Sequence, residues 1–298
     1  MKVKFEKWHG CKNDFIVIDT NQIDLLFESL VIASPGLCSR VGDGIGADGI
    51  ILLHKHGSQS QIPTHISIIN SDGSQAVTCG NGIRCAALYT HRRYCKEVEF
   101  DSEFLEFKLA NDTNVQCSFI NQDFVRVSMG EASLITAGKE LQDISEEISD
   151  VLSKANFKPE ELAYCNISNE HLIIVSESAS KDLIRKIGPG LQQVKRWPGI
   201  NVHLIKSTEP SSSSPDDITV GEALEAWTWE RGAGETNACG SGACAIGLHA
   251  LASGLVSRKS WVEVQMPGGD LYVQQSNPNT CVDLAGPAFF VYSGEFNI

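Results

Sequence analysis

The sequence has little positive charge and no long apolar run, and each absence excludes a class of function. Lysine and arginine number 24 against 37 aspartates and glutamates, which gives a formal net charge of −13 at pH 7. Nucleic-acid binding depends on clustered Lys and Arg that neutralise phosphates, so we expect no nucleic-acid partner. No stretch approaches the roughly 20 apolar residues that a membrane-spanning helix needs, so we expect no membrane partner either.

Cysteine is plentiful, but the spacings typical of metal sites are missing. The ten cysteines include no Cys-x-x-Cys pair, so we expect no structural zinc and no other metal. Residues 1–10 lack the apolar core and the small-residue cleavage site of an export signal. This predicts a cytoplasmic protein without a disulfide framework, in which most cysteines are small buried apolar residues.

The hydrophobic patterns predict many short strands and a few helices. Strand-like patterns occur at residues 3–8, 15–19, 49–54, 65–70, 98–109, 115–129, 172–176, 261–265 and 271–275. Helices are expected at residues 81–94, 141–155, 181–187 and 241–253, and Ser34-Pro35 predicts the start of a short helix toward Arg40. The mixture indicates an α/β (α+β) fold.

A short motif occurs twice, about half a chain apart. Cys79-Gly-Asn-Gly-Ile-Arg-Cys-Ala and Cys239-Gly-Ser-Gly-Ala-Cys-Ala-Ile both read Cys-Gly-polar-Gly, followed by a helical run. Two such copies indicate two related halves, each with a cysteine at the start of a helix. The helix after Cys239 is apolar nearly all round, so we expect strands to enclose it.

Each copy of the motif can bind an anion and ionise a thiol. The first N–H groups of a helix lack internal partners, and with the helix dipole they attract a carboxylate. The same field lowers the pKa of a cysteine placed there, and the glycines allow a sharp turn. Two sulfurs on opposite faces of one Cα would suit a racemase or epimerase with two acid/base groups. Since the sequence contains no recognisable signal for a pyridoxal lysine, we expect no cofactor.

Other interpretations of the motif stay open. It could mark a tight strand-to-helix turn with a buried cysteine. A Cys-His nucleophile would need a partner motif that the eight histidines do not form. A thiol redox protein would cycle its two cysteines through a disulfide. A non-catalytic amino-acid-binding protein could use the same anion site without needing two thiols.

The residues around both cysteines resemble the diaminopimelate epimerase family. The stretch from Asn70 to Cys85 resembles the family's first cysteine signature, and the stretch from Glu230 through Cys239 to Ala243 resembles the second. Further matches at residues 10–15, 44–48 and 286–288 extend the resemblance over nearly the whole chain.

The resemblance implies two pseudo-symmetric halves, each a β-barrel-like sheet around a central helix. One half would comprise residues 1–126 and 285–298, and the other residues 127–284. It implies a homodimer that interconverts LL- and meso-diaminopimelate without a cofactor, for lysine and peptidoglycan precursors. Cys79 and Cys239 would be the acid/base thiols. The substrate-binding residues implied are Asn13, Asn70, Gly80, Asn81, Asn169, Asn201, Glu230, Arg231, Gly240 and Ser241.

The chemistry of these residues suits a substrate with a distal ammonium and carboxylate. Arg231 can bind the carboxylate with two hydrogen bonds, and Glu230 can accept from the ammonium. The nearest rivals among enzymes, proline racemases and hydroxyproline epimerases, would not need this pair. Two residues depart from the family pattern, and the second of them, Gly49, concerns specificity. Asn169 precedes Glu rather than the usual Pro, and Gly49 replaces a glutamine found in many members. We therefore expect relaxed specificity, with glutamate for instance as a weak substrate.

Overall fold

The computed structural model describes residues 1–20, 23–55, 62–94, 104–137, 139–194, 199–212, 214–254, 256–277 and 281–298. The chain divides into two compact units, Met1–Ser128 with Gly286–Ile298 and Met129–Ala285. The limits predicted from the sequence lie one or two residues away. Within the described residues, no helix is long and apolar enough to cross a membrane.

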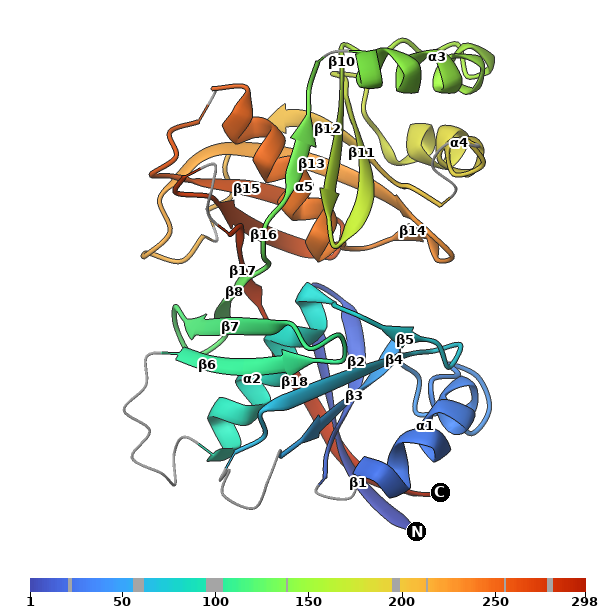
Figure 1. The fold of residues 1–298 in the computed structure, drawn as a ribbon, viewed down its shortest axis with the longest axis vertical. Coiled ribbons are helices and arrows are strands. Elements are labelled where there is room, and N and C mark those ends of the chain that lie inside the picture. The colour runs from blue at the N-terminus through green and yellow to red at the C-terminus, as the bar shows by residue number, and fades with distance from the viewer. Residues whose placement is uncertain are drawn as a thin grey trace. The chain divides into compact units, whose positions relative to one another are not determined.

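The first unit is a mostly antiparallel sheet with two helices (Figure 1). Its strands are β1 (Lys2–Gly10), β2 (Asn13–Asp19), β3 (Gly49–His54), β4 (His65–Asn70), β5 (Gln75–Ala76), β6 (Phe104–Leu109), β7 (Asn114–Phe119), β8 (Phe124–Ser128) and β18 (Phe289–Asn297). The strand β1 lies between β18 and β2, and β2 pairs in parallel with β3. The strand β4 follows antiparallel to β3 and parallel to β6, and the β6–β7–β8 meander completes the unit.

Helix α2 (Gly80–Tyr94) packs against β1, β2, β3, β4 and β8, and is buried from Gly80 to Thr90. Helix α1 (Ile23–Leu37) covers β3 and β4. The prediction that Ser34-Pro35 begins a helix is wrong, because Pro35 lies in the last turn of α1. Pro35 cannot donate a backbone hydrogen bond at this place. The helix is held in position by Leu30, which is fully buried against the sheet.

The second unit repeats the arrangement around its own central helix. Its strands are β9 (Ser133–Ile135), β10 (Glu161–Ile167), β11 (Asn169–Val175), β12 (Asn201–Thr208), β13 (Val220–Glu230), β14 (Gly234–Thr236), β15 (Trp261–Met266), β16 (Gly269–Gln274) and β17 (Asp283–Pro287). The pairs β11–β12 and β13–β15 are parallel, and the other neighbours in this sheet are antiparallel. Helix α5 (Gly240–Ala252) packs against β9 to β12, β15 and β16. The two units therefore share one plan, a buried helix wrapped by strands.

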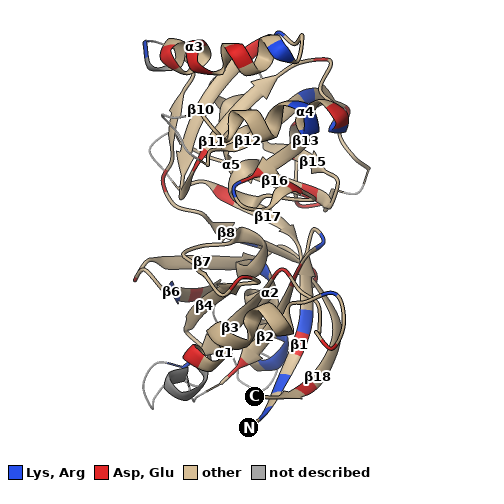
Figure 2. Ribbon diagram, turned by 90° about the vertical axis from the view of Figure 1, so that its right-hand side faces the viewer, with Lys and Arg blue, Asp and Glu red and all other residues tan. Residues whose placement is uncertain are grey.

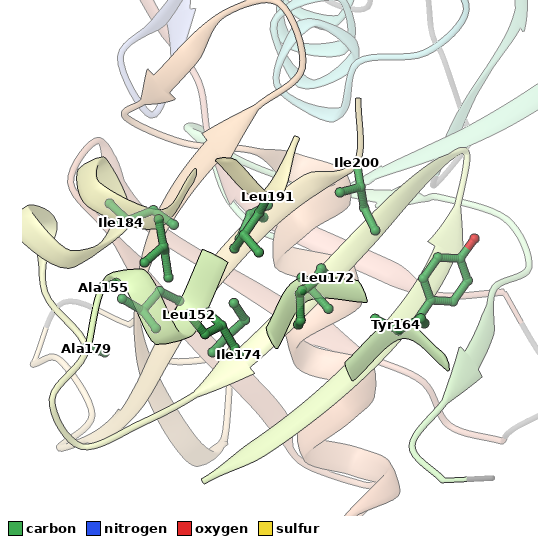
Figure 3. Packing of buried hydrophobic residues seen from close by; sticks show 14 residues of the cluster. Leu152, Ala155, Tyr164, Leu172, Ile174, Ala179, Ile184, Leu191 and Ile200 are labelled. Atoms are coloured by element: carbon green, nitrogen blue, oxygen red, sulfur yellow. The ribbon is translucent and has the colours of Figure 1, made fainter. Parts of the chain in front are cut away.

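Two further helices, α3 (Lys139–Lys154) and α4 (Lys181–Leu191), cover β10 to β12 on the face away from α5 (Figure 1). Figure 3 shows how Leu152 of α3 and Leu191 of α4 meet Ile174 of β11 in one apolar cluster. Acidic residues follow the exposed side of α3, and both signs of charge occur on α4 (Figure 2). Burial of the apolar stripe, at about 25 cal/mol per Å², holds these amphipathic helices on the sheet.

Two predicted strands differ from the structure. Residues 115–129 form β7 and β8 rather than one strand, because a turn held by Asn121 separates them. Residues 98–103 of another predicted strand lie outside the described residues, and β6 begins at Phe104. The remaining strand and helix predictions agree with the structure to within a few residues.

Candidate active-site residues

Both motif cysteines occupy the N-cap position of a central helix. The Cys79 carbonyl accepts the hydrogen bond of Ile83 N–H at 2.8 Å, and the Cys239 carbonyl accepts that of Ala243 N–H at 2.8 Å. The first N–H groups of α2 and α5 therefore surround each cysteine. Cys239 also uses its side chain as a cap, since its Sγ accepts from Gly242 N–H at 3.4 Å. The motif therefore lies at the start of a helix in each unit, and anion binding there stays a prediction.

One of the motif glycines is required for a reason that was not predicted. We predicted that they allow a sharp turn, but none of the four has a positive φ among the described backbone outliers. Gly242 is instead required by packing, because a Cβ there would lie 2.2 Å from His203 Cε1. Gly82 has more room, with Ile51 Cδ1 as the nearest atom at 3.3 Å.

In the first unit, Asn13 and Asn81 lie beside Cys79. The Cys79 thiol donates to Asn13 Oδ1 at 3.7 Å, a long sulfur contact. Asn81 Nδ2 donates to the same oxygen at 3.2 Å. Three of the residues implied by the resemblance thus meet at the start of α2, where Gly80 opens the helix.

A tight turn between β1 and β2 delivers Asn13 to this place. Cys11 and Lys12 form its centre with φ of 52° and 64°. Left-handed residues at both central positions fit a two-residue hairpin turn, whose usual residues are Asn and Gly. Non-glycine residues are strained in this region, and such strain tends to gather at functional sites.

A network of charged side chains fixes the Asn13 side chain through its amide nitrogen. Asn13 Nδ2 donates to Asp48 Oδ2 at 2.8 Å, and Arg40 donates to Asp48 Oδ1 at 2.7 Å. Arg40 also binds Asp14, which pairs with the buried Lys7 at 2.8 Å. Burial raises the pKa of Asp14, but the hydrogen bonds from Arg40 and Lys7 outweigh it and lower that pKa to about 2. The network fixes the Asn13 amide, with its oxygen toward Cys79.

Arg84 belongs to the first turns of α2. It was not predicted as a site residue. Its guanidinium is fully buried and donates to Asn81 Oδ1 at 2.8 Å and to the Pro287 carbonyl at 3.3 Å. The sequence shows only that Arg84 belongs to the first copy of the repeated motif. The second copy has no arginine at the corresponding position.

Asn70 and Gly49 are paired across β4 and β3. The Asn70 side chain donates to Ser74 Oγ at 2.9 Å in the turn to β5. Gly49 allows close strand packing, since a Cβ there would lie 2.7 Å from the Ile69 carbonyl oxygen. A glutamine at position 49 would therefore require a shift of β4.

In the second unit, Asn169, Asn201 and Arg231 converge at one edge of the sheet. The parallel strands β11 and β12 begin at Asn169 and Asn201, and the antiparallel β13 ends at Glu230. Asn201 Oδ1 accepts from Arg231 N–H at 3.0 Å, and Asn169 Oδ1 accepts from the Arg231 guanidinium at 3.2 Å. The stem of Arg231 packs over Gly199, where a Cβ would lie 2.5 Å from Arg231 Cδ.

Glu230 influences Cys239 directly. The Cys239 side chain is buried, and burial raises its pKa well above the usual value, with a further rise from the Glu230 carboxylate. The Gly242 N–H and Ser241 hydroxyl act in the opposite direction but are weaker. The prediction that a helix start lowers the pKa of the cysteine is therefore wrong for Cys239, because desolvation outweighs the helix field.

A buried chain of polar side chains lies beneath the first turn of α5. His203 Nε2 is 2.8 Å from His171 Nδ1, and His203 Nδ1 is 3.0 Å from Thr228 Oγ1. Burial lowers the pKa of His171 to about 3 and lowers that of His203 well below its usual value. Both rings are therefore neutral near pH 7. His171 and His203 were not predicted as site residues, because buried histidines leave no motif.

The structure thus groups the predicted residues into two sets. Cys79, Gly80, Asn81 and Asn13 form one set in the first unit, and Asn70 lies at the end of β4, before the turn to β5. Cys239, Gly240 and Ser241 lie at the start of α5, and Glu230, Arg231, Asn169 and Asn201 at a nearby sheet edge. Among the described residues, no group of three or more His, Cys, Asp or Glu could hold a metal ion.

Two units, each with a cysteine-capped central helix, define the fold class, and solved structures share it. A phenazine biosynthesis protein of the PhzF family from Bacillus anthracis has the same fold, with a TM-score of 0.68 and 13% identity over 100% of both chains. A probable proline racemase from Agrobacterium radiobacter K84 has a TM-score of 0.60 and 12% identity over 99% of this chain and 93% of the other. At these identities the likeness shows the fold alone.

The sequence narrows the class to one family. The family model for diaminopimelate epimerase matches residues 5–135 and 163–291. The diaminopimelate epimerase of Bacillus subtilis (strain 168) is 30% identical over 299 residues, which cover 98% of each chain. The chain belongs to the diaminopimelate epimerase family, as its cysteine signatures predicted.

Proposed function

We propose that the protein is a cofactor-independent epimerase that interconverts LL- and meso-2,6-diaminopimelate, with Cys79 and Cys239 as its two acid/base groups. One observation carries the proposal. In a chain of this family, the two signature cysteines both lie directly before the first turn of a buried central helix, where backbone N–H groups can bind a carboxylate.

Inversion needs one sulfur on each face of the reacting Cα, so the proposal requires that both units serve one substrate. One thiolate takes the α-proton, the C–H electron pair spreads into the carboxylate, and the other thiol returns a proton to the opposite face. The N–H groups after Gly80 and Gly240 stabilise the charge that develops on the carboxylate, with the Asn81 and Ser241 side chains beside them.

The remaining predicted residues would select the substrate. Arg231 and Glu230 suit the distal carboxylate and ammonium of diaminopimelate. Asn169 and Asn201 orient Arg231, and Asn13 and Asn70 supply amides on the side of Cys79. A proline racemase would have no use for the Arg231 and Glu230 charges, which favours diaminopimelate over the nearest alternative.

The test is incubation of the reduced protein with LL-diaminopimelate in D2O without pyridoxal phosphate. Proton NMR follows loss of the α-proton, and chiral chromatography follows the meso isomer. Wild type should form the meso isomer, and Cys79→Ser and Cys239→Ser should lose about 10²–10⁴-fold in rate because each removes one acid/base group. Cys281→Ser, at an exposed position, is the matched control and should behave as wild type.

Each alternative gives a different result in the same experiment. Exchange with proline or hydroxyproline but not with diaminopimelate would indicate a proline racemase type. Binding of diaminopimelate without exchange would indicate a binding protein. Full activity of both serine variants would disprove the two-base mechanism. Activity that needs an oxidant would indicate a thiol redox protein, whereas an epimerase should need reductant and lose activity if Cys79 and Cys239 form a disulfide.

The specificity proposal rests on Gly49, which offers no side chain to the substrate. We expect slow α-proton exchange with glutamate in a panel of single L-amino acids. No exchange with any of them would disprove relaxed specificity and leave the main proposal intact.

We also propose that the protein acts as a homodimer in the cytoplasm. Four successive side chains of β18 are large, apolar and exposed, from Phe289 at 40% to Tyr292 at 42%, and such a strip is typical of a protein interface. Val291→Lys should shift the mass measured by light scattering from dimer to monomer, and cell fractionation tests the location.

A further inference from the structure

The backbone of Cys239 is fixed from two sides. Its carbonyl accepts from Ala243 N–H at 2.8 Å within the first turn of α5, where Gly242 N–H also donates to its Sγ. Its own N–H donates to the thioether sulfur of Met266 at 3.4 Å. Within the described residues, this N–H has no other acceptor. Met266 therefore provides the backbone contact that reaches Cys239 from outside its own helix.

The end of β15 places Met266 at this position. Val264 and Met266 lie on the same face of the strand, both are buried, and β15 packs against α5. Beyond Met266 the chain turns into β16, and Gly268 N–H in that turn donates to the Asn237 carbonyl at 2.8 Å. The hairpin of β15 and β16 thus binds the segment that leads into α5 at two points, of which one is Cys239 itself.

A thioether is an unusual partner for a buried amide, because sulfur is a weak hydrogen-bond acceptor. An oxygen in its place would put a partial negative charge close to the Cys239 side chain, and a negative neighbour disfavours a thiolate. The Glu230 carboxylate already acts in that direction, since it adds to the rise that burial causes in the pKa of Cys239. The sulfur of Met266 accepts the N–H without adding an oxygen dipole to this effect.

We propose that Met266 is a positioning residue for the epimerisation, whose sulfur holds the Cys239 amide and thereby sets where the Cys239 Sγ lies relative to the substrate Cα. This rests on the proposed epimerase function. A backbone held at both its N–H and its carbonyl restricts the positions that the sulfur of Cys239 can reach. Proton transfer depends steeply on position, and a misplacement of about 1 Å can cost about 100-fold in rate.

The alternative is that Met266 only fills space, since its side chain is 6% exposed. A packing role depends on the shape and volume of the side chain, whereas the proposed role depends on the sulfur atom. Norleucine replaces that sulfur by a methylene group at nearly the same shape, and selenomethionine replaces it by selenium, which still accepts a hydrogen bond. The chain has three methionines, Met1, Met129 and Met266, so replacement of all methionine during expression changes few positions.

The first test is hydrogen exchange at the level of single amides, read by mass spectrometry with electron-transfer fragmentation. It needs no substrate, so it remains valid even if the epimerase assignment fails. The protein is prepared with methionine, norleucine or selenomethionine in a Met129→Leu background, so that replacement acts on Met266 and the exposed Met1. The amide of Ala245, in the buried middle of α5, reports whether the helix itself is intact.

We expect norleucine to speed exchange of the Cys239 amide about tenfold, the effect of losing one net hydrogen bond, and to leave the Ala245 amide unchanged. Selenomethionine should retain the exchange rates of the methionine form. Equal exchange of the Cys239 amide in the norleucine and methionine forms would overturn the proposal. Equal acceleration of the Cys239 and Ala245 amides would overturn it as well, because that result indicates packing alone.

The second test is steady-state kinetics with LL-diaminopimelate. The norleucine form should lose about tenfold in kcat, while its KM changes less than about twofold, because the groups proposed to bind the substrate are untouched. Selenomethionine should restore kcat. Met266→Leu makes the same comparison by mutation, and Met129→Leu is its matched control, since each removes a buried methionine.

An unchanged kcat in the norleucine form would overturn the positioning role even if the Cys239 amide exchanges faster. So would a selenomethionine form that loses as much kcat as the norleucine form. Absence of epimerisation in wild type would instead refute the proposed function, and the amide exchange would still decide whether the sulfur of Met266 holds Cys239.

Discussion

The two central helices begin alike but lie in opposite surroundings. Cys79 on α2 is half-exposed above a buried arginine, whereas Cys239 on α5 is buried beside a carboxylate. In the proposed mechanism, the shared helix start gives each unit a place for the substrate carboxylate. The difference lies in the side chains beneath each helix, and it teaches that a repeated backbone motif does not imply two equivalent thiols.

The largest expected effect is on stability, and it compares how tightly the first turns of α5 and α2 are packed. Gly242→Ala would place a methyl group 2.2 Å from His203 Cε1, whereas Gly82→Ala meets its nearest atom at 3.3 Å. We expect the first to lower the free energy of unfolding by about 3 kcal/mol or more and the second by about 1 kcal/mol or less, measured in urea. The double variant Gly242→Ala/His203→Ala should regain part of the loss. Equal losses in both glycine variants would refute the packing difference.

The next effect concerns substrate selection, which we assign to the second unit. Arg231→Leu should raise the KM for LL-diaminopimelate about 100-fold, because a charge-assisted pair to the distal carboxylate is lost. Its matched control is Arg185→Leu, which removes another exposed arginine of this unit that pairs with Glu235. If Arg231→Leu leaves KM unchanged, the distal carboxylate is bound elsewhere.

Acid should destabilise the two units to different extents, because their buried titratable groups differ. The lowered pKa values of His171 and His203 favour the folded state above about pH 6.5, and this stability is lost as the pH falls toward about 3, the folded-state pKa of His171. In the first unit burial also lowers the pKa of His9 on β1, whereas the lowered pKa of Asp14 matters only below about pH 3.9. At pH 5.5 the second unit should lose about 1.4 kcal/mol per histidine. Hydrogen exchange read by mass spectrometry should show faster exchange in β11 and β12 than in β6 and β7, which contain no histidine, and a uniform response would contradict this.

The smallest effect compares the residues two positions after each cysteine. Asn81 is anchored by Arg84 and bound to Asn13, whereas Ser241 lies 3.7 Å from Cys239 Sγ. We expect Asn81→Ala to lower kcat/KM about 30-fold and Ser241→Ala about threefold, because the first leaves buried polar groups unpaired. Similar losses in steady-state assays would show that the network around Asn81 adds little.

The sequence predicts most of the framework because periodicity reports local structure. The alternating strands, the amphipathic α3 and the apolar α5 are all recognisable from the spacing of hydrophobic residues. The helix predicted from Ser34-Pro35 failed because tertiary burial of Leu30 decides where α1 lies, and this outweighs the preference of proline for a first turn.

The site residues within the repeated motif could be predicted from the sequence. The contacts between residues far apart in the chain could not. Cys79 and Cys239 follow from the repeat, and Glu230 and Arg231 from the resemblance. The contacts of Asn13 with Asp48 and of His203 with His171 join segments 35 and 32 positions apart, so no local pattern reveals them. The raised pKa of Cys239 depends on burial, which the motif does not encode.

The pairing of β18 with β1 has a consequence for the order of synthesis. The strand β1 is completed on one side by β2 and on the other by residues from 289 onward. During translation the second unit is made whole while β1 still lacks a neighbour, because Gly286–Ile298 belongs to the first unit. On the ribosome, the α5 half can therefore fold first, and the α2 half must keep an open strand edge until residues 286–298 emerge from the exit tunnel.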